Sequence, residues 1–204
     1  MRRAPAVLAL MAGAAFAGEP APPAPPSQSA PSSAPAKSED VEAQRKACDA
    51  KQGKACTALA VRYLGGNGVA ADEKRALELF DRACTAGDGA GCSMLGAIFN
   101  RGRGAIAPDY ARSYKLSKRG CELGDDNGCY DQACDLVAAR GIEKSTALAV
   151  PAFERLCKKG LAQACGSLGM LYYVGDGVKR DPQRATELLD QACKGGDVRS
   201  CPRD

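Results

Sequence analysis

Apolar residues recur four positions apart in short blocks along the chain, for example at Leu59 and Tyr63 and again at Leu168 and Tyr172. This spacing places both residues of a pair on one side of a helix. A glycine-rich stretch follows each block, and a second helical pattern then starts at an Asp or a Ser. The alternation predicts helical hairpins, and it returns about every 36 residues.

The ends of the helices can be placed from local signals. The first helix of each hairpin is expected near residues 54–64, 90–101, 127–139 and 163–174. The second helix begins at a residue that caps helix N-termini well, with Pro182 at the first helical position of the last copy: Asp72, Asp109, Ser145 and Asp181. Each second helix should end before a glycine in the left-handed conformation: Gly87, Gly124, Gly160 and Gly195.

The period divides residues 38–204 into repeats. A half repeat at 38–50 is followed by repeats near 52–87, 88–124, 125–160 and 161–196, with a C-terminal stub at 197–204. The third copy is degraded, because Gln132 stands where the other copies have Leu. A hairpin of this size cannot bury its own apolar side, so successive hairpins must stack. We therefore predict an all-α fold, an α-solenoid of helical hairpins.

Ten of the eleven cysteines follow the same period. They form pairs eight positions apart: Cys48/Cys56, Cys84/Cys92, Cys121/Cys129, Cys157/Cys165 and Cys193/Cys201. Each pair is expected to flank the turn between the second helix of one copy and the first helix of the next. Residues eight apart in a straight helix lie about 12 Å from each other, whereas a disulfide needs Cα atoms within about 7 Å. The glycines between the paired cysteines allow the chain to reverse, so we predict five disulfides. The alternative interpretation is that the cysteines bind zinc, but the chain lacks Cys-x-x-Cys clusters and histidine.

Cys134 is the eleventh cysteine and has no partner in this scheme. It lies on the first helix of the third copy, in the position of Val61, Ala97 and Met170. Two interpretations remain open. It is either a small buried filler or a free thiol on the ligand-facing side, with a possible redox role.

Composition excludes several functions. The 28 basic residues nearly balance the 24 acidic ones, so no concentrated basic face for nucleic acid is expected. With no histidine, imidazole catalysis and histidine-bound zinc are excluded. We expect neither a metal nor a cofactor.

The N-terminal residues predict export. Residues 1–17 combine Arg2 and Arg3 with an apolar run and end in Ala15-Phe16-Ala17, the pattern of a signal peptide. The run is too short to span a bilayer, so the mature chain should carry no transmembrane segment. Residues 18–37, rich in Pro, Ala and Ser, are expected to form an extended linker. Disulfides and export agree with a periplasmic or extracellular location.

The pattern of one copy carries a family resemblance. Leu168-Gly169, Tyr172, Gly175-Asp176-Gly177-Val178, Asp181, Ala185 and Ala192-Cys193 together resemble the Sel1-like repeat. The cysteine spacing is similar to that of the secreted cysteine-rich branch of the family, whose members are often labelled β-lactamase-like. The resemblance covers about residues 40–201. It implies a fold related to tetratricopeptide repeats, with the first helices lining a concave groove.

Two functions follow as hypotheses. The first is binding of a protein or peptide through the groove, where the alignment of the first helices places six candidate residues: Asn100, Arg101, Tyr130, Cys134, Met170 and Tyr173. The alternative, carried by the resemblance, is a β-lactamase-like protein that binds a cell-wall or β-lactam-type small molecule and hydrolyses it weakly. No lysine has a serine three positions before it, and Ser-Asp-Asn and Lys-Thr-Gly are absent. No catalytic residue can be assigned, and enzymatic activity is not favoured.

Overall fold

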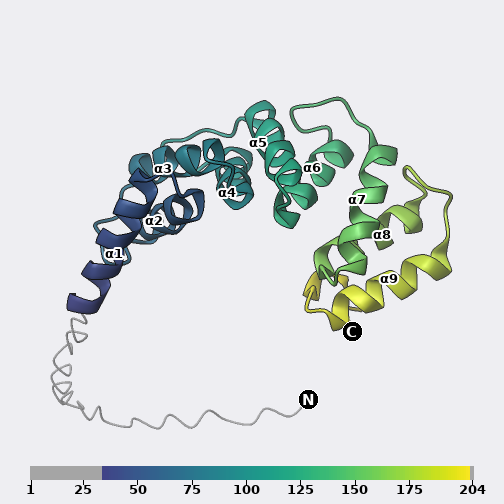
Figure 1. Ribbon diagram of the computed structural model, residues 1–204. Coiled ribbons are helices and arrows are strands. Elements are labelled where there is room, and N and C mark those ends of the chain that lie inside the picture. Colours follow the sequence, from purple (N-terminus) through teal and green to yellow (C-terminus); the bar gives the residue numbers. More distant parts are fainter. Residues whose placement is uncertain (1–33, 203–204) are drawn as a thin grey trace, which may run out of the picture. The chain divides into compact units, whose positions relative to one another are not determined.

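The computed structural model describes residues 34–202, and all of its regular structure is helical (Figure 1). The elements are α1 (Ala34–Asp49), α2 (Gly53–Gly65), α3 (Glu73–Thr85), α4 (Gly89–Arg101), α5 (Tyr110–Glu122), α6 (Asp126–Ala138), α7 (Thr146–Lys158), α8 (Ala162–Val174), α9 (Pro182–Lys194) and a 3₁₀ turn η1 (Val198–Ser200). Within this part of the chain there is no strand, and only Arg103 and Ile106 form an isolated β-bridge. The expected signal peptide at 1–17 and most of the expected linker lie outside the described residues.

The hairpins are α2–α3, α4–α5, α6–α7 and α8–α9, and each packs on the next as predicted for an α-solenoid. We call α2, α4, α6 and α8 the first helices and α3, α5, α7 and α9 the second helices. The ends of the first helices differ from the sequence-based expectation by at most one residue. No helix among residues 34–202 is long and apolar enough to cross a bilayer.

Capping residues start the second helices where the sequence places them. The side chains of Asp72, Asp109 and Asp181 each accept a hydrogen bond from the backbone N–H three residues on. Ser145 precedes α7 but makes no such bond. At the other end, Gly87, Gly124 and Gly160 are left-handed as expected.

The expectation for the last of these glycines was wrong by one residue. Gly195 has φ −80°, and it is Gly196 that takes the left-handed conformation, with φ 95°. The reason is the repeat register: Gly196 lies 36 residues after Gly160, and Gly195 corresponds to Ala86, which also has a negative φ.

Five disulfides form, in the pairing that the spacing predicts. Their Cα–Cα distances lie between 4.3 and 4.8 Å, which the reversal of the chain at each turn makes possible. The first bridge joins α1 to the first hairpin, and the next three join consecutive hairpins.

The last disulfide departs from the expectation at Cys201. Cys56, Cys92 and their counterparts lie on first helices, but Cys201 follows η1 in extended backbone, with φ −75° and ψ 145°, and is half-buried. The physical reason is Pro202, because a proline disfavours the helical conformation of the residue before it. Cys193–Cys201 therefore still forms, with a Cα–Cα distance of 4.8 Å, but it ties α9 to the C-terminal segment instead of joining two hairpins.

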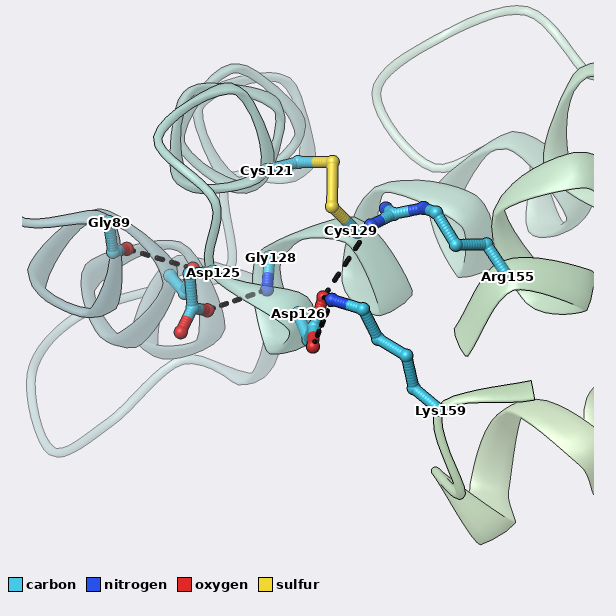
Figure 2. Close-up of a disulfide and its surroundings, with 9 residues drawn as sticks. Gly89, Cys121, Asp125, Asp126, Gly128, Cys129, Arg155 and Lys159 are labelled. Carbon is cyan, nitrogen blue, oxygen red and sulfur yellow. Dashed lines mark hydrogen bonds and ion pairs between the residues drawn. A yellow bond between two sulfur atoms is a disulfide. The ribbon is translucent and has the colours of Figure 1, made fainter. Parts of the chain in front are cut away.

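One junction shows how the bridges combine with other contacts. Figure 2 shows Cys121–Cys129, between α5 and α6. Beside it Asp125 accepts a hydrogen bond from the N–H of Gly128, while Asp126 pairs with Lys159 of the next turn at 2.8 Å. The disulfide thus closes this junction, and the ion pair beside it links the junction to the next turn.

The apolar core of the described chain is divided into two clusters. One is built around Leu79, Phe80 and Leu95 and the other around Phe153, Leu156 and Leu168. Between them α5 contributes Ser113, Ser117 and Gly120 as its buried residues, where other second helices bury Ala, Leu or Phe. The middle hairpins therefore approach through small side chains rather than through large apolar ones.

Candidate functional site

The six candidate residues all lie on first helices, two each on α4, α6 and α8. The first helices also lie close to one another. α2 contacts α4, and α4 contacts α6, whereas neighbouring second helices make no contact of comparable extent. We call the solvent-facing side of α2, α4, α6 and α8 that bears Val61, Ala97, Cys134 and Met170 the first-helix face.

Two of the candidates tie neighbouring first helices together. The side-chain amide of Asn100 on α4 donates a hydrogen bond to Asp135 Oδ1 on α6, at 3.1 Å. The hydroxyl of Tyr130 on α6 lies 3.2 Å from Ser167 Oγ on α8, and its ring meets Phe153 edge-on at 5.8 Å. Burial raises the pKa of Tyr130. Both residues therefore fix the spacing of the first helices, and only their remaining surface is open to a ligand.

Asp135 is a fully buried carboxylate that sequence reasoning missed. Its Oδ1 accepts hydrogen bonds from Asn100 and from Arg140 Nε, the latter at 2.9 Å. Its Oδ2 has no partner within the described chain. Burial raises the pKa of Asp135, and the guanidinium of Arg140 opposes that rise. The available signal was its place in the repeat, because the equivalent residues of the second and fourth copies, Ile98 and Leu171, are buried and apolar.

Asp131 and Cys134 lie beside this carboxylate on α6. Burial, and then the charge of Asp135, raise the pKa of Asp131 to about 6. Burial also raises the pKa of the Cys134 thiol to about 11. Because the thiolate is the reactive form of cysteine, this environment favours the inert, half-buried thiol over the redox hypothesis. Arg101, which is exposed on α4, lowers the pKa of Asp131 by its positive charge and so lies within electrostatic reach of it.

The α8 part of the first-helix face is apolar and exposed. Met170, Tyr173 and Val174 have 50%, 52% and 58% of their surface accessible. Arg180 donates from Nε to the carbonyl of Tyr173 at 3.0 Å, and its guanidinium lies 6.0 Å from the ring centroid. Single exposed apolar residues are common, but three neighbours on one helix are a typical feature of an interaction surface.

The first-helix face combines apolar and polar surface. No group of three or more potential metal ligands occurs within residues 34–202. The one free thiol there is shielded, and the carboxylates of α6 are held by arginines or partly buried. What the face does present is an apolar strip on α8 next to a polar, partly charged centre on α4 and α6.

A stack of disulfide-linked helical hairpins with such a face defines the class of protein, an α-solenoid repeat protein. The comparisons specify it further: the Sel1 repeat profile matches residues 53–88, 89–125 and 162–197, so the chain belongs to the Sel1 repeat family. The third copy, at about 125–160, is not matched, in keeping with its altered sequence.

Solved structures agree with this assignment. The chain is 25% identical, with a TM-score of 0.71, to a Sel1 repeat protein from Oxalobacter formigenes, covering 80% of this chain and 66% of that one. It is 24% identical, with a TM-score of 0.70, to c5321, a protective antigen of uropathogenic Escherichia coli with an SLR fold, covering 78% and 34% respectively. The chain therefore spans between one third and two thirds of the length of these structures.

A third structure, the immunity protein Pa5087 from Pseudomonas aeruginosa, matches at 20% identity and a TM-score of 0.52, covering 80% of this chain and 60% of that one. It shows the shared fold alone. Among curated proteins no sequence matches this chain. Sel1 repeats typically mediate protein–protein interaction.

Proposed function

We propose that this chain is an exported binding module that holds a protein or peptide partner on its first-helix face. The observation that carries the proposal is the exposed apolar strip of Met170, Tyr173 and Val174 on α8. Tyrosine and methionine are enriched at protein interfaces relative to the rest of the surface. The polar centre around Asp131 and Arg101 would then set orientation and specificity.

Export is supported by the covalent framework. Ten cysteines form five disulfides in the described residues, and disulfides persist in the periplasm and outside the cell rather than in the reducing cytosol. The basic and apolar residues of 1–17 match the signal peptide that such a location requires. We place the mature protein in the periplasm or outside the cell.

The test is affinity capture from a cell-envelope extract with the purified, oxidised protein as bait. The triple variant Met170→Ser, Tyr173→Ser and Val174→Ser removes the apolar strip without touching a buried residue. A partner that binds there should be lost with the variant and retained with Tyr110→Ser, which removes an exposed aromatic side chain from α5. Equal capture by all three proteins would refute the proposal for this face.

The β-lactamase-like alternative is not proposed, since no specific observation in the fold, the site or the comparisons favours it. A nitrocefin assay on the same oxidised protein tests it directly. Hydrolysis that disappears in a groove variant such as Tyr173→Ser would replace binding by catalysis as the function of this face.

A further inference from the structure

A crevice recurs between successive hairpins on the side of the molecule away from the first-helix face. In the second copy it is lined by α3, α4 and α5, including Leu77, Leu95, Phe99 and Arg112. In the fourth copy the equivalent residues Leu168, Tyr172 and Arg184 line it. In the third copy Tyr114, Gln132, Leu136 and Leu148 take the same places. The crevices have volumes of 280 Å³, 170 Å³ and 590 Å³ in the second, fourth and third copies.

An arginine lines this crevice in the second and fourth copies. Arg112 lies over the ring of Phe99, with its guanidinium carbon 4.1 Å from the ring centroid. Arg184 lines the crevice together with Tyr172. In the first copy the residue that corresponds to Arg112 is Arg75, which pairs with Glu78 at 3.4 Å. The device that the second and fourth copies share is an arginine and an aromatic residue that line the same crevice, and in the second copy the guanidinium lies over the ring.

The third copy has lost every part of that device. Leu148 replaces the arginine and is 69% exposed, although it is a leucine. Leu136 replaces the aromatic residue, and Gln132 replaces the buried leucine. The base of this crevice therefore has less apolar surface and one side-chain amide. The chain thus leaves a large crevice with an exposed apolar rim at the one copy where its own arginine is missing.

The charges at the rim change together with the crevice. In the second copy Glu78 and Asp81 of α3 line the crevice that holds Arg112, and in the fourth copy Glu154 accompanies Arg184. The residues of α5 that correspond to Glu78 and Asp81 are Lys115 and Lys118. Both are exposed, and neither takes part in an ion pair among residues 34–202. Two acidic positions of α3 are thus basic on α5, while Glu143 and Lys144, the latter paired with Asp176, also line the crevice of the third copy.

We propose that the crevice of the third copy binds an acidic peptide segment of a partner protein. An apolar side chain of the segment enters between Tyr114, Leu136 and Leu148, where the arginine of other copies would lie. Carboxylates on either side of it meet Lys115 and Lys118, and Gln132 offers a hydrogen bond to the peptide backbone. The partner thus supplies the acidic groups that the second and fourth copies carry among their own crevice residues.

This surface is separate from the one proposed for the main function. Gln132 and Cys134 are two residues apart on α6, which places them about 200° apart around the helix axis. A peptide in the crevice therefore does not cover the first-helix face. Variants of one surface leave the other intact, so the two proposals fail or succeed independently.

The test is selection of peptides from a phage library of random dodecamers on the oxidised wild-type protein, with parallel selection on a filled-crevice variant. The double substitution Leu148→Arg and Gln132→Leu restores the residues of the other copies and is expected to preserve the fold, as circular dichroism can verify. Wild-type protein should enrich peptides with a large apolar residue flanked by Asp or Glu. A synthetic form of such a peptide should bind the filled variant at least tenfold more weakly, by fluorescence anisotropy.

The basic rim is tested with the same peptide. Lys115→Glu combined with Lys118→Glu should weaken binding by about tenfold or more, and added salt should weaken binding to the wild type. Lys74→Glu, on the exposed side of α3, is the matched control and should bind as the wild type does. Peptides that bind both crevice forms equally, an absence of enriched peptides, or enrichment of basic or neutral sequences would each overturn the proposal.

Discussion

Ala139 ends α6 in a left-handed conformation, with φ 54° and ψ 37°, that glycine adopts at the equivalent positions of the first and fourth copies, whereas the glycine of the second copy has a positive φ with ψ 163°. Gly66, Gly102 and Gly175 hold that place with φ values of 68°, 71° and 81°. A side chain with a Cβ is strained there, whereas glycine is not. The degraded third copy thus keeps the geometry of the repeat without the residue that suits it.

Ala139→Gly is therefore expected to raise the free energy of unfolding by about 1 kcal/mol, as measured by urea denaturation under oxidising conditions. Its control is Ala138→Gly, one residue earlier and still helical, which should lower stability by up to about 1 kcal/mol because glycine is unfavourable in a helix. If both substitutions shift stability in the same direction, strain at Ala139 is not the cause.

Asp131 makes stability depend on pH, because burial and the charge of Asp135 raise its pKa to about 6. An acid whose pKa is raised on folding stabilises the protein most where it is protonated in both states. That contribution is fully present below about pH 4 and is lost as the pH rises through about 6. Asp131→Asn should therefore increase the free energy of unfolding by about 1 kcal/mol at pH 8, allowing for partial exposure, with little change near pH 3.5. Asp190→Asn, exposed on α9, should show no such pH-dependent gain.

At the scale of elements, α5 differs from the other second helices by the small polar residues that it buries. Ser113 occupies the position of Ala76, Ala149 and Ala185, and its hydroxyl is buried with no hydrogen-bond partner in the described structure. An unsatisfied buried hydroxyl costs free energy, which the alanine of the other copies avoids.

Ser113→Ala should stabilise the protein by about 1 kcal/mol in thermal or urea unfolding. The reverse change in the next second helix, Ala149→Ser, places a hydroxyl in an equally buried position and should be destabilising by a similar amount. A loss of stability in Ser113→Ala would mean that the hydroxyl has a partner, such as an internal water.

The disulfides stabilise the turns at the ends of the hairpins. Removing Cys157–Cys165 by substituting both residues with Ala should lower the free energy of unfolding by about 2–3 kcal/mol, because the unfolded chain regains the entropy of a short closed loop. Cys134→Ala is the control, since it leaves all five disulfides in place. Equal effects of the two changes would argue against the junction as a source of stability.

The elements were predictable from sequence to the extent that their signals are local. Helix bounds follow from four-residue spacing and from caps such as Asp72, and the disulfides follow from eight-residue spacing across a turn. The eight-residue spacing predicted the disulfide partner of Cys201 but not the extended backbone of Cys201. Pro202 was a local signal for that extended backbone.

Contacts between elements were not predictable in the same way. The role of Asp135 depends on which side of α6 meets α4, since its bonds go to Asn100 and Arg140. The crevice beside Leu148 likewise depends on three helices that only packing brings together. The groove residues remain a prediction, although the structure places all six on first helices.

For the whole molecule, oxidation state and folding are expected to be inseparable. The native, unreduced protein should yield one thiol per chain with Ellman's reagent, and that thiol, Cys134, should react slowly until denaturant is added, because it is half-buried and its pKa is raised to about 11. Full reduction removes all five bridges and should abolish cooperative unfolding near neutral pH. Rapid reaction of several thiols in the native protein would contradict the disulfide framework.

The placement of the disulfides has a consequence for proteolysis. Every bridge closes a turn at the end of a hairpin, and none joins the two helices of one hairpin. A single tryptic cut after exposed Arg103, in the loop between α4 and α5, would leave two fragments with no covalent link, held only by helix packing. A cut between Cys84 and Cys92 would leave the fragments still bonded. A single cut is thus expected to separate the chain covalently in the loops inside the hairpins and not between paired cysteines.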